Sequence, residues 1–221
     1  MRILTRKPKE TGRDYALRVI RENIVSMDLL PGTSFSESEL ANQLGLSRTP
    51  VREAIMELSS YKVIDVCPHK KSTVTLINYS VVDEARFLRE TLDCAVAREA
   101  CEMATVENID GLKNMTMLQD FYLRSPNGDE FFRLDASIHR ELFRITYKMA
   151  VFTLLDRFSI HIERIVRAGI DGIDKRALLT TNNALIEAIE NHDPDKASES
   201  AKDHLNCYIR DLIIGRKQRS I

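Results

Sequence analysis

The spacing of apolar and polar positions divides the chain into a short mixed segment and a long helical one. Apolar residues at helical spacing predict a first helix over about residues 11–28 and two shorter helices within residues 36–58. Two runs rich in β-branched residues, at 63–67 and 73–77, predict a β-hairpin. From residue 78 onward the pattern is almost entirely helical. The predicted fold class is therefore mainly α, with a small β element in the N-terminal part.

The two short helices carry clear start and stop signals. Ser36 and Glu39 have the S-x-x-E spacing of a capping box, in which each side chain bonds the other residue's backbone amide. Gly45 can take the left-handed conformation that ends a helix. Ser47 is the N-cap candidate of the second helix, and Pro50 falls within its first turn, where no amide is needed. Two short helices joined by a tight turn are typical of a helix-turn-helix.

The second of these helices separates an apolar face from a polar one. Its apolar face holds residues at i, i+3, i+4 and i+7, which are Val51, Ala54, Ile55 and Leu58. On the other side, Arg48 and Arg52 lie four residues apart, and Ser47 and Thr49 add hydroxyls at a helix N-terminus with partial positive charge. Such groups suit phosphate oxygens and guanine edges in a major groove, although a solvated face is the simpler alternative. We predict that Ser47, Arg48, Thr49 and Arg52 contact double-stranded DNA.

The tip of the predicted hairpin is cationic. Residues 68–72 at this tip read Pro-His-Lys-Lys-Ser, and the hairpin comes right after the second short helix. In a winged helix-turn-helix such a tip lies along the DNA backbone or enters the minor groove, where cations are favoured. Lys70 and Lys71 therefore join the predicted DNA contacts, with an ordinary charged turn as the alternative.

Six helical segments are predicted after residue 78. Ser80 is the expected cap of the first, Leu154 lies on the apolar stripe of the fourth, and Asp193 followed by Pro194 marks the start of the last. Short loops between consecutive helices predict an antiparallel all-α bundle of about six helices. The segments cover about residues 80–104, 106–124, 129–148, 150–168, 174–191 and 193 onward.

Charge supports a division into two domains. Residues 1–76 hold 12 Lys and Arg against 9 Asp and Glu, whereas the remainder holds 20 against 24. The basic excess coincides with the predicted winged helix-turn-helix domain, residues 1–77, and the acidic excess with the bundle, residues 78–221. Residues 1–10 are expected to form a mobile arm able to contact phosphate, with a plain disordered terminus as the simpler alternative.

Composition excludes several classes of protein. The four cysteines, Cys67, Cys94, Cys101 and Cys207, show no C-x-x-C spacing and are expected to be buried thiols in a reducing cytosol. No apolar run approaches the ~20 residues of a membrane span, and the N-terminus lacks the apolar core of a signal peptide. With no Trp and few aromatic residues, stacking on single-stranded nucleic acid is not expected. We expect a cytoplasmic protein with no membrane partner.

The bundle contains one constellation of potential ligands. Asp135 and His139 lie four residues apart on one helix face, and His204 lies on the inward stripe of the last helix. From spacing alone, these side chains are either hydrogen-bonded core residues or three N/O ligands of a divalent metal ion.

Two stretches of sequence resemble a known family of regulators. The string L-S-R-T-P-V-R-E-A, residues 46–54, resembles the recognition-helix motif of the GntR superfamily of bacterial transcription regulators. The strings LDASIHRELF and ALIEAIENHDPDKASESAKDHL resemble the FCD effector domain of the FadR-like subfamily, over about residues 80–215. The resemblance implies a homodimer that binds a DNA operator and responds to a small effector, an organic acid.

The same resemblance implies a metal site in the bundle. In the FCD domain an Asp-x-x-x-His pair and two later histidines commonly hold one divalent ion, and Asp135, His139 and His204 match three of these positions. Asn182 stands at the remaining histidine position. Two interpretations stay open: Zn, Ni or Mn held by Asp135, His139, Asn182 and His204 with water or effector, or a metal-free pocket that binds a ligand directly.

One further position matches the family pattern and another differs from it. Arg89, in R-E-T-L-D, stands where the family has an Arg and is a candidate clamp for an effector carboxylate, with a salt bridge to Asp93 as the alternative. The predicted effector site therefore comprises Arg89, Asp135, His139, Asn182 and His204. At the hairpin tip the family pattern usually ends in Arg-Gly, whereas this chain has Lys70-Lys71.

The function predicted is a ligand-responsive transcription regulator and not an enzyme. The alternatives are a metal-dependent hydrolase and a metal-sensing regulator, both using Asp135, His139 and His204. No residue is predicted to be catalytic, because the sequence shows no positioned base beside these ligands.

Overall fold

The structure is a computed structural model that describes residues 1–67, 70–124, 129–169 and 172–217. The chain forms two compact units. Unit 1 comprises Met1–Val82 and Ile160–Ala168, and unit 2 comprises Asp83–Ser159 and Gly169–Ile221.

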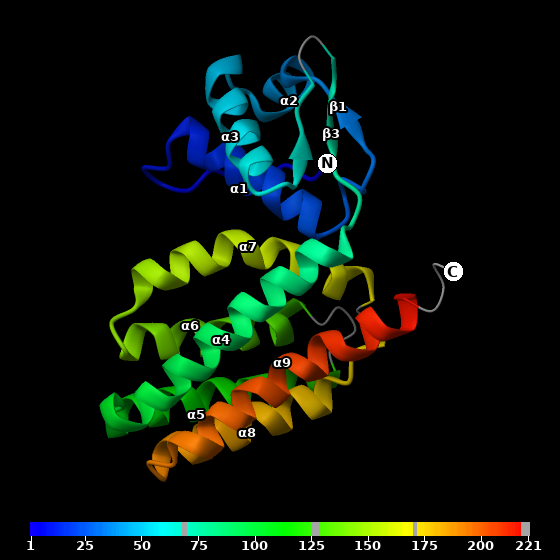
Figure 1. Ribbon diagram of the computed structural model, residues 1–221. Coiled ribbons are helices and arrows are strands. Elements are labelled where there is room, and N and C mark those ends of the chain that lie inside the picture. Colours follow the sequence, from blue (N-terminus) through cyan, green and yellow to red (C-terminus); the bar gives the residue numbers. More distant parts are fainter. Residues whose placement is uncertain (68–69, 125–128, 170–171, 218–221) are drawn as a thin grey trace. The chain divides into compact units, whose positions relative to one another are not determined.

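Unit 1 contains a winged helix-turn-helix (Figure 1). Its helices are α1 (Gly12–Val25), α2 (Glu37–Leu44) and α3 (Arg48–Ser60), and its strands are β1 (Ser34–Phe35), β2 (Ile64–Asp65) and β3 (Ser72–Val74). The three strands form an antiparallel sheet in the order β1-β3-β2, with Ile64 paired to Val74 and Ser34 paired to Thr73. The predicted hairpin is thus present, and β1 is a third strand that the sequence pattern did not indicate.

The turn between α2 and α3 follows the predicted local signals. Ser36 Oγ accepts a hydrogen bond from the Glu39 amide at 3.1 Å, and the Glu39 carboxylate accepts one from the Ser36 amide at 2.8 Å. Gly45 has φ +65°, the left-handed conformation expected at its position. Ser47 precedes α3 in an extended conformation, but its side chain makes no capping hydrogen bond.

The N-terminal residues differ from their prediction. Instead of forming a mobile arm, they lie against α1: the Arg2 amide donates to Asn23 Oδ1 at 2.5 Å, and the Tyr15 hydroxyl donates to the Leu4 carbonyl at 2.9 Å. Asn23 is buried and returns a hydrogen bond to the Arg2 carbonyl at 2.8 Å. Because these bonds satisfy a buried side-chain amide, the arm is part of the domain.

Six α-helices follow among the described residues, which confirms the mainly α fold class. They are α4 (Tyr79–Met103), α5 (Val106–Phe121), α6 (Asp129–Ile145), α7 (Met149–Ala168), α8 (Lys175–Glu190) and α9 (Pro194–Lys217), with a short 3-10 helix at Tyr122–Arg124. Asp193 accepts from the Lys196 amide at 3.0 Å, as expected of the cap of the last helix. The cap predicted at Ser80 is wrong, because Asn78 Oδ1 accepts from the Ser80 amide at 3.0 Å.

Several predicted burials also need correction. Leu154 of α7 was expected to face inward but is 63% exposed. Of the four cysteines, which are all free, Cys101 is buried and Cys94 half-buried, but Cys67 and Cys207 are exposed. Periodicity identifies an apolar stripe, but it does not say how much of that stripe the rest of the fold covers. In the part of the chain that the structure describes, no helix meets the length and apolarity that crossing a membrane requires.

Candidate functional site

The α3 helix presents the polar face that the sequence predicted. Arg48, Thr49 and Arg52 are exposed, together with Ser47 just before the helix. The opposite side of α3 is buried in the core of unit 1 through Val51, Ala54, Ile55 and Leu58. The packing of one side therefore fixes the direction in which the two guanidiniums project.

The first turn of α2 holds the cations of this face. Arg48 donates to the Ser38 hydroxyl, and Arg52 Nε lies 3.8 Å from a carboxylate oxygen of Glu37. Lys71 from the hairpin lies 2.8 Å from Glu39, and this hydrogen bond is the main reason that the pKa of the Glu39 carboxyl is lowered. Sequence reasoning missed these contacts, because they join residues that are far apart in the chain.

The hairpin tip is described in part. Lys70 and Lys71 are exposed, and the Lys70 amide donates to the Cys67 carbonyl at 3.2 Å. Pro68 and His69, which belong to the same predicted tip, lie outside the described residues. That Lys70 and Lys71 contact DNA stays a prediction.

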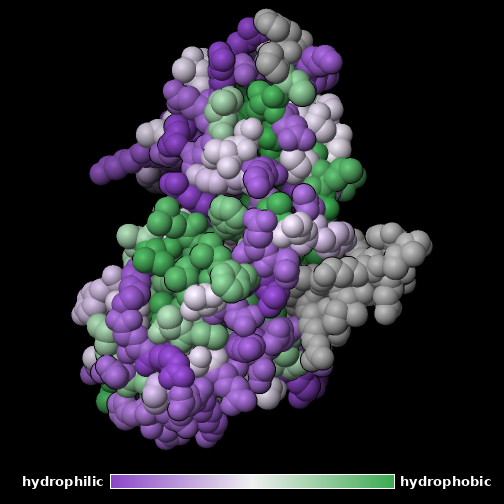
Figure 2. All heavy atoms as spheres, in the orientation of Figure 1, coloured by the Kyte–Doolittle hydropathy of each residue, from purple (hydrophilic) through white to green (hydrophobic). Residues whose placement is uncertain are grey.

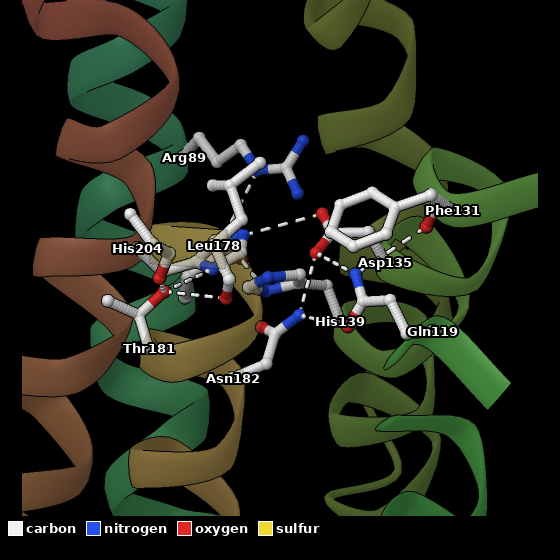
Figure 3. A network of polar contacts seen from close by, with 11 residues as sticks. Arg89, Gln119, Phe131, Asp135, His139, Leu178, Thr181, Asn182 and His204 are labelled. Atoms are coloured by element: carbon white, nitrogen blue, oxygen red, sulfur yellow. Dashed lines mark hydrogen bonds and ion pairs between the residues drawn. The ribbon is translucent and has the colours of Figure 1, made fainter. Parts of the chain in front are cut away.

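The second candidate site is a buried polar cluster in unit 2 (Figure 3). Asp135 and His139 come from α6, Asn182 from α8 and His204 from α9, and all four side chains are buried. The structure thus brings together three helices that are separated by many residues in sequence. Figure 3 shows Asn182 and Gln119 directed at Asp135, with the side chains of His139 and His204 beside them.

Asp135 is the hub of the cluster. Its Oδ1 accepts hydrogen bonds from Gln119 Nε2 at 3.0 Å and from Asn182 Nδ2 at 2.7 Å. Its Oδ2 lies 3.3 Å from His204 Nε2. Because a carboxylate accepts and does not donate, the amide nitrogen of Asn182 must face it. Asn182 therefore acts as a donor to Asp135, and its Oδ1 makes no hydrogen bond within the described chain.

His139 is the least satisfied member. Neither of its ring nitrogens makes a hydrogen bond to any residue that the structure describes, although Nδ1 lies 3.6 Å from Asp93 Oδ2. Its ring centroid lies 4.6 Å from that of His204. Burial, followed by the proximity of His204, lowers the pKa of His139 to about 4. At neutral pH the imidazole is therefore uncharged, with a lone pair available.

Arg89 makes the ion pair that was the alternative to a ligand clamp. Its Nε lies 3.1 Å from Asp93 Oδ2, and Asp93 is buried. The role of Arg89 as a carboxylate clamp stays a prediction, because a bound acid would have to share this guanidinium with Asp93.

The cluster fits a divalent cation by its donor set. One ligand atom each from Asp135, His139 and His204 lies within 4.8 Å of the others. One carboxylate oxygen and two imidazoles are ligands that Zn, Ni and Mn accept. The unsatisfied buried nitrogens of His139 support this fit, since buried polar atoms are normally bonded. Asn182 belongs to the cluster, but as arranged its amide nitrogen is the atom directed at Asp135.

Three residues of the site were not predicted as members. Gln119 supports Asp135, Thr181 lies 2.9 Å from His204 Nδ1, and Asp93 lies beside His139. Asp93 was considered only as a partner of Arg89. Gln119 and Thr181 have no distinctive spacing relative to the histidines, so only the packing of the helices reveals them.

Comparisons with protein families match both units. The FCD domain pattern matches residues 84–206, and the pattern described as bacterial regulatory proteins of the gntR family matches residues 16–74. The chain is 27% identical over 199 residues to the HTH-type transcriptional repressor RspR of Escherichia coli strain K12, covering 90% of this chain and 87% of RspR. A probable D-xylose utilization operon transcriptional repressor of Paenarthrobacter nicotinovorans is 22% identical over 199 residues, covering 89% and 85%.

Solved structures show the same fold. E. coli McbR/YncC aligns with a TM-score of 0.81 at 17% identity, covering 94% of this chain and 99% of that one. A putative transcriptional regulator GntR from Rhodococcus sp. RHA1 aligns with a TM-score of 0.70 at 19% identity, covering 92% and 97%.

Proposed function

Because this chain belongs to the GntR family of bacterial regulatory proteins, in the FadR-like group with a C-terminal FCD domain, we propose that a small organic acid controls its binding to DNA. It is a transcription regulator with a DNA-binding winged helix-turn-helix. The hydrolase alternative is set aside, since both domains and the relatives are those of regulators and not of enzymes. A DNA-binding regulator works where the chromosome lies, so the proposed location is the cytoplasm.

The DNA contacts proposed are those of the α3 face and the hairpin. Arg48 and Arg52 are placed to read base edges, Ser47 and Thr49 to bind phosphate at the start of α3, and Lys70 and Lys71 to follow the backbone. The exposure of all six residues supports this assignment. The contacts of Arg48 and Lys71 with α2 hold both side chains on the same surface of unit 1.

A homodimer is proposed, with two heads reading an inverted repeat. Figure 2 shows hydrophobic residues gathered on the face of unit 2 where α4 and the first part of α7 lie. Phe87 of α4 and Leu154 of α7 are 70% and 63% exposed, respectively. Large apolar side chains exposed together favour association with a second copy.

The effector is proposed to bind at the cluster of Asp135, His139 and His204 together with one divalent cation. A cation held by these three residues would supply a Lewis-acidic point to which carboxylate oxygens bind. Arg89 would bind the same acid from α4. Asn182 would orient Asp135 through its amide, leaving coordination positions to the effector or to water.

The observation that carries this proposal is the buried imidazole of His139, which has a lowered pKa and no hydrogen bond within the described chain. Such a group is costly in a core and useful in a ligand site. Ligand binding there would change DNA affinity if the acid bound the DNA-competent and DNA-incompetent arrangements with different affinities.

Elemental analysis and melting scans test the proposal. Protein purified without chelator or affinity-tag metal is analysed for metal, then melted with acetate, succinate and citrate, with and without EDTA. About one equivalent of metal per chain, with an acid raising the melting temperature only when metal is present, would support the combined site. Stabilisation that is indifferent to EDTA would support a metal-free pocket. Stabilisation by metal alone, with no acid response, would favour a metal sensor.

DNA release supplies the functional readout. An operator fragment selected from random duplexes is bound, and the stabilising acid is added. Release from wild-type protein but not from His139→Ala is the expected result. His192→Asn is the matched control, because the His192 ring bonds the Cys101 carbonyl outside the cluster and Asn tolerates its backbone φ of 54°. A normal acid response of His139→Ala would refute the assignment of the pocket.

A further inference from the structure

Thr181 of α8 makes a three-way contact beside the cluster (Figure 3). Its Oγ1 lies 2.9 Å from His204 Nδ1, 2.8 Å from the Leu178 carbonyl oxygen and 3.2 Å from the Ala177 carbonyl oxygen. A hydroxyl carries one proton, so it donates to one of these groups at a time and accepts from the others only if they carry a proton. Of the three, only the imidazole is able to change from acceptor to donor.

A change of Nδ1 from acceptor to donor also changes the role of Nε2, the other ring nitrogen of His204. Nε2 lies 3.3 Å from Asp135 Oδ2. In a neutral imidazole one nitrogen donates and the other accepts. Without a cation, Nε2–H facing the carboxylate is the favourable tautomer, because a lone pair there would repel Asp135. Nδ1 is then an acceptor, and the Thr181 hydroxyl donates to it.

Cation binding requires the opposite tautomer. A lone pair on Nε2 has to face the site, so the proton must reside on Nδ1. Nδ1–H then donates to Thr181 Oγ1, and the hydroxyl proton turns to the Leu178 carbonyl. One proton leaves Nε2 and one arrives at Nδ1, so the total number of protons on His204 and Thr181 is unchanged.

We propose that Thr181 is a positioning residue that keeps His204 Nδ1 hydrogen-bonded in both tautomers, and that it thereby raises the affinity of the cluster for a divalent cation. This inference rests on the proposed cation site of Asp135, His139 and His204. Without the hydroxyl, Nδ1 would lose this hydrogen bond in both tautomers. The loss would weigh more on the cation-binding tautomer, because an acceptor for its Nδ1–H fixes the imidazole and raises the basicity of Nε2 toward a cation.

A purely structural role is the competing explanation, and the same helix offers its control. Thr180 bonds the Arg176 carbonyl at 2.9 Å as a helical threonine does, but it is exposed. Thr181→Val and Thr180→Val therefore remove the same group from neighbouring positions. Thr181→Ser restores the hydroxyl alone.

The experiment measures Zn²⁺ affinity by competition with a chelator, and the His204 tautomer by long-range ¹H–¹⁵N NMR of histidine-labelled full-length protein. In the wild type, the His204 signal is expected to change from Nε2–H to Nδ1–H when Zn²⁺ is added. Thr181→Val should bind Zn²⁺ about 10- to 100-fold more weakly, the usual cost of losing a group that orients a ligand. Thr181→Ser and Thr180→Val should stay close to wild type.

The possible failures are distinguishable. A wild-type protein that binds no Zn²⁺ would overturn the cation site and this inference with it. If the wild type binds Zn²⁺ but Thr181→Val binds it equally well, only the role of Thr181 is overturned. A His204 tautomer that is the same with and without Zn²⁺ would overturn the tautomer exchange, whichever affinities are measured.

Discussion

Lys71 allows a quantitative test of the proposed DNA surface. Its ammonium lies 2.8 Å from Glu39, and both side chains are about half exposed, so the cation is available to a phosphate. Lys71→Ala is expected to weaken binding to all duplexes alike, because a phosphate contact carries no base information. The deficit should be larger at low salt than at high salt, since the lost contact no longer releases counterions.

The magnitude follows from counterion release. Each neutralised phosphate contributes about 0.9 to the slope of log affinity against log salt, so two heads of a dimer would lose about 1.8. Between 50 and 200 mM salt the ratio of wild-type to variant affinity should therefore change by about 12-fold. Fluorescence anisotropy with a labelled operator and with an unrelated duplex measures both slopes.

Two companion variants sharpen the test. Lys113→Ala is the matched control, because Lys113 of unit 2 has the same charge and lies 2.6 Å from Glu190 in an exposed ion pair. Glu39→Gln keeps a side chain able to complete the capping box but removes the carboxylate beside Lys71, so binding should tighten about two- to five-fold. Parallel salt slopes for wild type and Lys71→Ala would refute the phosphate contact.

Three other outcomes are expected. Arg48→Ala should cost about 1–3 kcal/mol in operator binding and relax preference at one base pair, measured with base-substituted operators. Asp135→Ala should lower the free energy of unfolding by about 2–6 kcal/mol in urea, because two buried amides lose their acceptor at about 1–3 kcal/mol each, whereas Asp135→Asn keeps one acceptor and should lose less. With EDTA present, stability should fall on acidification from pH 6.5 toward pH 4, because the pKa of His139 is about 4 when folded and about 6.5 when unfolded. His139→Leu should show a smaller loss over that range, and an equal loss would contradict the burial of a neutral imidazole.

The sequence was sufficient to predict those elements that have a periodic apolar pattern or local cap and turn residues. The six helices of the second half follow from apolar periodicity, the start of α2 follows from the Ser36–Glu39 capping box, and its end follows from Gly45. Strand β1 was missed because two residues are too few to show alternation; its position depends on pairing with β3. The exposure of Leu154 was missed for a related reason, since one apolar stripe suits a core and a subunit interface equally well.

Residues of the candidate site could be predicted only where two of them share a helix or where the sequence resembles a family pattern. Asp135 and His139 stand out by their spacing of four, and their proximity to His204 is observed in the fold. Gln119 and Thr181 carry ordinary side chains at positions without a pattern, yet one supports the carboxylate and the other the imidazole. The packing of the helices brings these groups together, and no local sequence pattern indicates that packing.

Asn182 is the position at which the site differs most from the family pattern. Replacing it with His should change the affinity for metal and the stability of the metal-free protein in opposite directions. Asn182→His would offer a further imidazole to the cation, so Zn²⁺ affinity should rise. The same change removes the amide that donates to Asp135 Oδ1 and to Gln119 Oε1, so the metal-free protein should melt lower. The drop in melting temperature on adding EDTA to the Zn²⁺-loaded protein should thus exceed that of the wild type. Asn183→His, at the exposed neighbouring position, controls for the added histidine. If EDTA had equal effects on Asn182→His and the wild type, position 182 would lie outside the reach of the cation, and its amide would serve only its hydrogen bonds to Asp135 and Gln119.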